Sequence, residues 1–166
     1  MKDDGNISIR EAAAEDAPLI LEFIKRLAEY EKLSDCVTAT EEGLRESIFD
    51  KGYAHALICR SGGVPAGFAV YFFNYSTFVG KPGLYLEDIF VLPEYRGRGL
   101  GRALFARLGK IAEEKGCGRL ELAVLDWNEP SIGFYKARGA RPMDDWTVYR
   151  LDREAIAGLA AGDTAE

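Results

Sequence analysis

The stretch LEDIFVLPEYRGRGLGRALF, residues 86–105, joins an apolar strand-like run, a glycine- and arginine-rich turn and the start of an amphipathic helix. Backbone N–H groups at a helix N-terminus lack helical partners, and the helix dipole favours an anion there. Glycines remove side chains that would keep an anion away, and arginines add positive charge. The turn holds Arg96, Gly97, Arg98, Gly99, Gly101 and Arg102. The stretch therefore predicts a phosphate-binding turn between a strand and a helix.

Two familiar nucleotide-binding patterns fit this turn poorly. A P-loop needs lysine followed by serine or threonine after its last glycine, and no such pair follows Gly101. A dinucleotide fingerprint needs glycine at positions 97, 99 and 102, but residue 102 is arginine. That fingerprint also opens a series of parallel strand–helix units, whereas this motif follows several strands. The turn therefore predicts a different phosphate ligand.

The composition is that of one globular domain: 166 residues, 48% hydrophobic and 29% charged. A net charge of −6 argues against a general nucleic-acid binder and fits a cationic or neutral small substrate better. Three widely spaced cysteines, at positions 36, 59 and 117, and one histidine, His55, predict neither a zinc site nor a disulfide scaffold. Because the sequence shows no apolar leader and no run of membrane-spanning length, we expect a cytoplasmic protein without membrane association.

The hydrophobic patterns predict the element order β-α-α-β-β-β-α-β-α-β. The predicted strands cover residues 7–10, 54–60, 65–75, 84–92, 118–127 and 146–152. The predicted helices cover residues 16 to about 30–32, 41–49, 99–115 and 129–138. This order predicts an α/β (α+β) fold with a mixed, mostly antiparallel sheet and helices on both faces. We expect a single domain over 1–166, with a core at about 7–152 and a tail at 153–166 that ends in a small, polar, frayed stretch.

The turn resembles a known motif. Residues 95–102, Tyr-Arg-Gly-Arg-Gly-Leu-Gly-Arg, are similar to the Q/R-x-x-G-x-G/A acetyl-CoA motif of the GNAT N-acetyltransferases, and the element order matches over about residues 7–152. Residues 85–91, 122–132 and 134–136 resemble the diamine (spermidine/spermine) acetyltransferases, and more closely their thialysine branch. The resemblance implies a sheet that splays at the cofactor site, acetyl-CoA as cosubstrate, no metal, and a homodimer.

The resemblance also implies which residues bind acetyl-CoA. In this family the splayed strand pairs with pantetheine as if a strand were added, and the turn holds the pyrophosphate. We interpret the side chains of Phe90 and Val91 as core, so that only their backbone would act. Asn128 would bind the cofactor or cap a helix, or do both. The implied cofactor residues are Ile89, Phe90, Val91, Arg96, Gly97, Arg98, Gly99, Leu100, Gly101, Arg102, Asn128 and Tyr135.

Two residues are the candidates for proton transfer. The Tyr135 phenol, with an ordinary pKa of about 10, is protonated at neutral pH and matches the family's general acid; the alternative is a tyrosine of the core. Glu87 matches the family's proposed base, acting through water on the ammonium; the alternative is a salt bridge to a nearby arginine. Strand alternation sends Glu87 and Asp88 to opposite faces.

Substrate contacts follow from the same resemblance. Tyr30 and Glu31 match positions where polyamine acetyltransferases bind substrate, with an exposed charged helix end as the alternative. Ser76 stands where the polyamine-selective branch has aspartate, which should weaken binding of a long polycation. The pair Ser76-Thr77 resembles the thialysine branch, although Phe78 replaces its tryptophan. The expected substrate residues are Tyr30, Glu31, Ser76, Glu87 and Asp88.

Together these patterns predict an N-acetyltransferase that moves acetyl from acetyl-CoA to a primary amine of a small lysine-like or diamine molecule. The amine would attack directly in a ternary complex. Two alternatives stay open. One is a GNAT enzyme with another amine acceptor, such as a protein N-terminus or an aminoglycoside. The other is a non-catalytic acyl-CoA-binding sensor on the same fold.

Overall fold

The computed structural model describes residues 6–162, which divide into two compact units, one reaching to Ala123 and one beginning at Val124. The first unit holds the sheet and the predicted phosphate-binding turn. The second holds two helices and the chain that joins them. The expectation of one domain over residues 1–166 stays a prediction.

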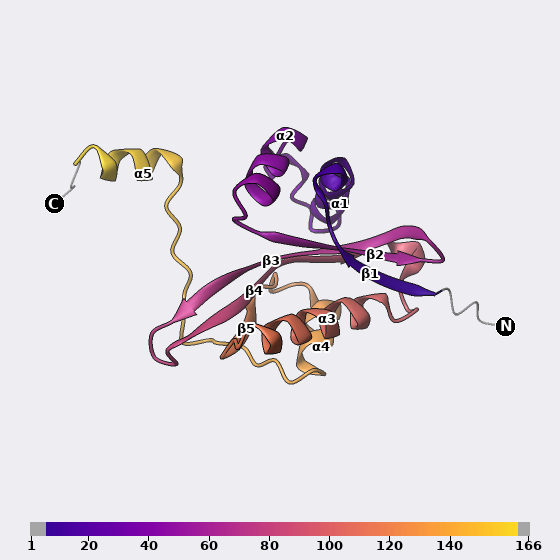
Figure 1. Cartoon of the computed structure of the whole chain (residues 1–166). Coiled ribbons are helices and arrows are strands. Elements are labelled where there is room, and N and C mark those ends of the chain that lie inside the picture. The colour runs from indigo at the N-terminus through magenta and orange to yellow at the C-terminus, as the bar shows by residue number, and fades with distance from the viewer. Residues whose placement is uncertain (1–5, 163–166) are drawn as a thin grey trace. The chain divides into compact units, whose positions relative to one another are not determined.

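The first unit is built on a five-stranded sheet in the order β1-β2-β3-β4-β5 (Figure 1). Its strands are β1 (Ile7–Glu11), β2 (His55–Ser61), β3 (Val64–Ser76), β4 (Lys81–Val91) and β5 (Arg119–Leu122). The first four pair antiparallel with their neighbours, whereas β5 pairs parallel with β4. The predicted mixed, mostly antiparallel sheet is confirmed. Glycines at 62 and 63, both at positive φ, close the predicted hairpin between β2 and β3.

Helices cover both faces of this sheet, as predicted (Figure 1). One face packs against α1 (Ala17–Tyr30) through apolar residues that include Ile20, Phe23 and Phe68. The other packs against α3 (Leu100–Glu114) through its stripe of Leu100, Leu104, Leu108 and Ile111, all four buried. The remaining helical segments are η1 (Ala14–Asp16), η2 (Ser34–Cys36), α2 (Glu41–Leu44), the π-helical η3 (Arg45–Asp50) and η4 (Pro93–Tyr95).

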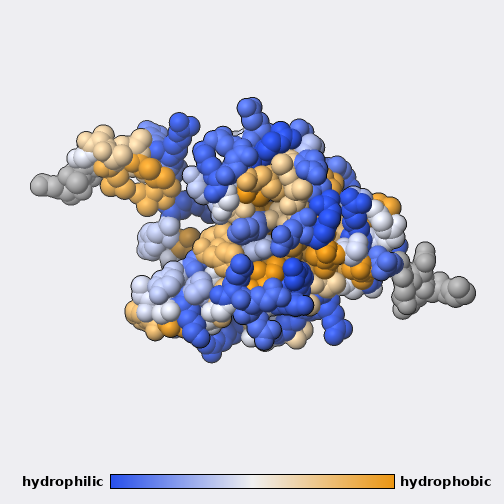
Figure 2. Space-filling view, viewed as in Figure 1, coloured by the Kyte–Doolittle hydropathy of each residue, from blue (hydrophilic) through white to orange (hydrophobic). Residues whose placement is uncertain are grey.

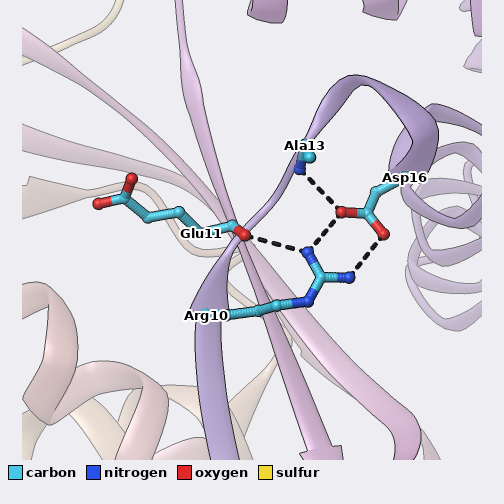
Figure 3. A network of polar contacts seen from close by, with 4 residues as sticks. All are labelled: Arg10, Glu11, Ala13 and Asp16. Atoms are coloured by element: carbon cyan, nitrogen blue, oxygen red, sulfur yellow. Dashed lines mark hydrogen bonds and ion pairs between the residues drawn. The ribbon is translucent and has the colours of Figure 1, made fainter.

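A bidentate ion pair holds the corner where β1 turns into α1. Both guanidinium arms of Arg10 donate to the Asp16 carboxylate, at 2.6 and 2.8 Å, and the backbone N–H of Ala13 donates to it at 2.8 Å (Figure 3). Asp16 is buried, and hydrogen bonding to Arg10 lowers the pKa of its carboxyl below the ordinary value. The pair therefore anchors the helix that carries Tyr30 and Glu31 at its far end.

The second unit differs from the sequence prediction at two places. Its helices are α4 (Glu129–Lys136) and α5 (Arg153–Ala160). The strand predicted over 146–152 is wrong for the described residues, because this segment forms no ladder with them. The tail is helical where fraying was expected, since the Asp152 carboxylate accepts the Ala155 N–H at 2.9 Å and caps α5. Residues 163–166 of that expectation lie outside the described residues.

Candidate active site

Strand β4 has an open edge beside the turn. Parallel pairing with β5 covers only Gly83–Leu86 of β4, because β5 ends at Leu122, although a longer strand over 118–127 was predicted. From Glu87 to Val91 the strand pairs with β3 alone in the described part of the chain. This is the splay that the family resemblance implied, and it leaves backbone groups of Ile89–Val91 on an edge where an extended ligand can add.

A bulge in β4 lies at Glu87. The register places Leu86 opposite Tyr71 and Asp88 opposite Val70, so Glu87 is the extra residue between them. Leu86 packs in the cluster on the α3 face, but Phe90 packs in the cluster on the α1 face. The bulge therefore changes the alternation and places Asp88, two residues before Phe90, on the α1 face. Alternation alone did not predict which acid faces α1.

The carboxylates of Glu87 and Glu31 both lie within electrostatic reach of Asp88. Burial raises the pKa of Asp88 to about 6, and the carboxylates of Glu87 and Glu31 add to the rise. Burial also raises the pKa of Glu31. Among residues 6–162, neither Glu87 nor Asp88 has an ion pair or side-chain hydrogen bond, so the salt bridge left open for Glu87 is not formed there. The arrangement favours a cationic ligand.

Backbone hydrogen bonds cap α1 around Glu31. The N–H of Leu33 donates to the Ala28 carbonyl at 2.8 Å, and that of Lys32 donates to the Glu29 carbonyl at 3.1 Å. Lys32 adopts the left-handed conformation, with φ 61°, which this hydrogen-bond pattern usually assigns to glycine. A non-glycine residue there costs about 1–2 kcal/mol, so the surrounding contacts must hold it. The helix end is thus capped by its own backbone, and the substrate role of Tyr30 and Glu31 stays a prediction.

The predicted phosphate turn has the geometry of an anion cradle. Gly97 and Gly99 have φ values of 75° and 91°, which favour glycine. No atom lies within 4 Å of a side chain added at Gly97, and only Ile7 Cδ1, at 3.9 Å, lies near one added at Gly99. Helix α3 begins at Leu100 without a side-chain cap, which leaves its first N–H groups for a ligand. The site fits the pyrophosphate of acetyl-CoA.

Two of the turn's arginines lie over aromatic rings. The Arg96 guanidinium carbon is 4.8 Å from the centre of the Tyr30 ring and 5.3 Å from that of Phe90. Its Nε donates to the Val91 carbonyl at 2.9 Å. The Arg98 guanidinium lies 5.4 Å from the centre of the Tyr95 ring. Sequence reasoning placed Arg96 with the cofactor residues and missed its contact with Tyr30, which no spacing rule predicts.

The structure does not bring Ser76 to the acidic residues. Ser76 is buried at the end of β3, opposite Lys81, and its Oγ accepts the Val79 N–H at 3.3 Å. Asp88 lies opposite Val70, six residues along β3 from Ser76. At about 3.3 Å per residue this separation is about 20 Å. Ser76 therefore shapes the turn between β3 and β4, and its predicted contact with substrate stays a prediction.

In the second unit, Asn128 is the N-cap of α4 and Tyr135 lies on this helix. Asn128 is buried and its Oδ1 accepts the Ser131 N–H at 3.4 Å, which confirms the helix-cap interpretation. Tyr135 is half-buried, and its ring meets that of Phe134 edge-on with centroids 5.5 Å apart. Gly139, at φ 87°, ends the helix region as predicted. The cofactor and acid roles of the two residues stay predictions.

A cavity of about 580 Å³ is lined by none of the predicted site residues. Its wall includes His55, stacked on Tyr71 at 5.2 Å between centroids and edge-on to Phe73 at 5.7 Å. His55 opens β2, as expected of a strand-end residue.

Residues 6–162 hold no group of three or more metal-ligating side chains. Within the same residues no helix is both long and apolar enough to cross a membrane.

Comparisons with known proteins agree with this geometry. The model of the acetyltransferase (GNAT) family matches residues 20–140. A thialysine N-epsilon-acetyltransferase of Bos taurus is 42% identical over 93% of this chain and 97% of its own. A spermidine/spermine N(1)-acetyltransferase-like protein of Homo sapiens is 36% identical over 92% of this chain and 23% of its own. A solved integron cassette protein of V. cholerae, 24% identical, superposes with a TM-score of 0.76 over 93% of this chain and 97% of that chain.

Proposed function

The chain belongs to the acetyltransferase (GNAT) family and is an N-acetyltransferase that uses acetyl-CoA, and from this premise we propose that it acetylates the terminal amine of a small cationic substrate. The proposed acceptor is thialysine or a lysine-like amino acid, with a diamine or polyamine as the second candidate. One observation carries the proposal: the 16 residues 87–102 hold the adjacent acids Glu87 and Asp88, an open strand edge and a predicted phosphate turn in succession.

The proposed reaction is a direct attack in a ternary complex. The acceptor ammonium first loses a proton, through water, to a carboxylate of the β4 bulge. The neutral amine then attacks the thioester carbonyl, so that a C–N bond forms and the C–S bond breaks. Tyr135 donates its phenolic proton to the departing thiolate and regains one from solvent. One of the two protons of the attacking nitrogen leaves to solvent, and the amide product keeps the other. No protein nucleophile takes part, and the buried Cys59, whose pKa burial raises to about 11, is unsuited to be one.

Glu87 and Asp88 have different roles toward the acceptor in this proposal. Glu87 is exposed and lies at the bulge, which suits a group that exchanges protons with water. Asp88, with a pKa of about 6, is suited to accept a proton near neutral pH and to attract the ammonium. Glu31 adds a third negative charge from the end of α1, and Tyr30 is the aromatic neighbour of the acceptor. The cluster supports a cationic acceptor.

The residues of the cofactor site would hold acetyl-CoA in two ways. The open edge of Ile89–Val91 is suited to pair with pantetheine, and the N–H groups of Gly97–Arg102 are suited to bind the pyrophosphate. Arg98 and Arg102 add positive charge, and Asn128 is proposed as a second contact to the cofactor. Acetyl-CoA supplies the activated acetyl group.

The relatives support the choice of acceptor. The bovine relative, named for thialysine, matches nearly its whole length, and the human protein named for spermidine and spermine also matches most of this chain. Serine at position 76, where the polyamine-selective branch has aspartate, also favours the shorter acceptor. Two alternatives must be tested against this proposal. One is a different amine acceptor, such as a protein N-terminus or an aminoglycoside, and the other is a sensor without turnover.

A thiol-release assay with acetyl-CoA and a panel of amines tests this proposal. The panel contains thialysine, lysine, ornithine, spermidine, an aminoglycoside and a peptide with a free N-terminus. We expect the highest kcat/KM for thialysine, a lower value for spermidine, and the lowest values for the last two. Acetyl-CoA binding without thiol release for any amine would support the sensor and contradict the enzyme.

We further propose that the enzyme is a cytoplasmic homodimer. The segment 146–152 exposes large apolar side chains: Trp146 is 75%, Val148 83% and Tyr149 89% exposed. Ile156 and Leu159 of α5 are also exposed, and Figure 2 shows hydrophobic residues over this helix. Such a surface supports contact with a second copy. Light scattering should give twice the chain mass, and Val148→Asp should reduce it to one chain mass.

The free cysteines support the proposed location in a reducing compartment.

A further inference from the structure

Arg96 joins the phosphate turn to the acceptor side of the site. Its guanidinium lies over Tyr30 of α1 and Phe90 of β4, and its Nε donates to the Val91 carbonyl. The rings of Tyr30 and Phe90 are 6.3 Å apart and tilted by 50°, so the three side chains form one contact group. Residues from α1, β4 and the turn thus meet at a single guanidinium.

Only arginine has the shape for this position. Its planar guanidinium can present a face to an aromatic ring and an N–H edge to a carbonyl at the same time. Lysine offers a compact charge without that plane, so an exchange to lysine keeps the charge and loses the geometry. Arg96 directly follows η4 and precedes Gly97, so a displacement of the turn also displaces the Arg96 side chain.

The contact reaches the acidic cluster through one peptide unit. Tyr30 directly precedes Glu31, and two backbone hydrogen bonds cap α1 at this end. The Glu31 carboxylate is one of the charges that raise the pKa of Asp88. A shift of Tyr30 therefore moves the Glu31 carboxylate, which acts on the acceptor. Arg98 instead stacks on Tyr95 of η4 and has no such contact with α1.

We propose that the Arg96–Tyr30 contact couples the two substrates, so that binding of acetyl-CoA at the turn tightens binding of the amine at Glu31 and Asp88. Arg96 is in this view a positioning residue of the acceptor site. The inference rests on the proposed function, because it assumes that the turn binds the cofactor and the acids bind the amine. Coupling of this kind is reciprocal, so the amine must tighten cofactor binding by the same factor.

Calorimetric titration with coenzyme A, which lacks the acetyl group and therefore cannot react, measures this factor. Its Kd is determined without amine and with saturating thialysine, and the ratio is the coupling factor. For the unaltered chain we expect a ratio of about two to five, the range that one exposed cation–π contact provides. Tyr30→Leu and Arg96→Lys should bring the ratio close to one.

Two matched variants separate coupling from simple loss of binding. Tyr30→Phe keeps the ring and should keep the coupling factor, whatever it does to either affinity alone. Arg98→Gln removes a turn arginine that stacks elsewhere, and should weaken coenzyme A without changing the factor. Because Arg96 is exposed, the Arg96→Lys variant should fold normally. It therefore tests the coupling even if the Tyr30→Leu variant has a lowered melting temperature.

The outcomes distinguish this inference from the proposed function. An unaltered chain that releases thiol but shows a ratio of one overturns the coupling and leaves the enzyme assignment intact. The same holds if Tyr30→Leu and Arg96→Lys keep the unaltered ratio. Failure of the unaltered chain to bind coenzyme A overturns the proposed function and the coupling with it.

Discussion

Asp88 directly follows Glu87 on β4, and burial together with the Glu87 carboxylate raises the pKa of Asp88 to about 6. The folded chain therefore binds this proton more tightly than the unfolded chain does. By linkage, the contribution of Asp88 to stability falls as pH rises from about 4 to about 6, and it stays low above that range. The ionised Asp88 side chain therefore lowers the free energy of unfolding, as is common for acids at functional sites.

We predict that Asp88→Asn stabilises the protein and slows turnover. Asparagine resembles the protonated acid, so the free energy of unfolding should rise by about 1–3 kcal/mol at pH 8 and stay unchanged at pH 4. Urea denaturation at the two pH values, with Glu22→Gln as an exposed control, measures this difference. An equal gain at both pH values would contradict the raised pKa.

Replacing the candidate acid should affect chemistry more than binding. Tyr135→Phe removes the phenolic proton and keeps the ring, so kcat should fall by about 10²–10⁴ while the Kd of acetyl-CoA changes little. The control is Tyr53→Phe, since Tyr53 is exposed and has no proposed role. Steady-state thiol release and calorimetry supply both numbers. Full turnover in Tyr135→Phe would remove this residue as the acid.

The phosphate turn predicts a difference between two glycines with similar strain. Gly97→Ala forces a side chain onto a residue at φ 75°, at a cost of about 1–2 kcal/mol, so the turn shifts and acetyl-CoA should bind about 5- to 30-fold more weakly. Gly62→Ala imposes similar strain at φ 56° in the β2–β3 hairpin and should leave the Kd unchanged. The assignment of the turn is refuted if the two variants bind acetyl-CoA equally well.

The corner between β1 and α1 should show the opposite pH dependence to Asp88. The pKa of Asp16 is lowered by Arg10, so its contribution is present at neutral pH and is lost as pH falls through that lowered pKa. Asp16→Asn should reduce the free energy of unfolding by about 1–3 kcal/mol at pH 7, because it leaves the Arg10 guanidinium without its carboxylate (Figure 3). Denaturation of both proteins at pH 7 and pH 2.5 should show that the difference in the free energy of unfolding is smaller in acid, and a difference that is equal at the two pH values would argue against the ion pair.

Elements that depend on local residues were predicted well. The glycines of 96–102, the stripe of α3 and the hairpin at residues 62 and 63 each carry their signal within a few residues, and the structure has them as expected. Segments that depend on a pairing partner were predicted less well. Strand β5 is shorter than its apolar pattern suggested, and 146–152 forms no ladder within residues 6–162, because a strand exists only where a second strand bonds to it.

The sequence by itself determined the family, the phosphate turn and the residue types available for acyl transfer, since these follow from the identity and spacing of neighbours along the chain. Only the tertiary structure decided that β4 bulges at Glu87, that Asp88 joins Glu31 on the α1 face, and that Arg96 stacks on Tyr30. Each of these results from contacts between elements far apart in sequence, and packing, rather than local propensity, sets their geometry.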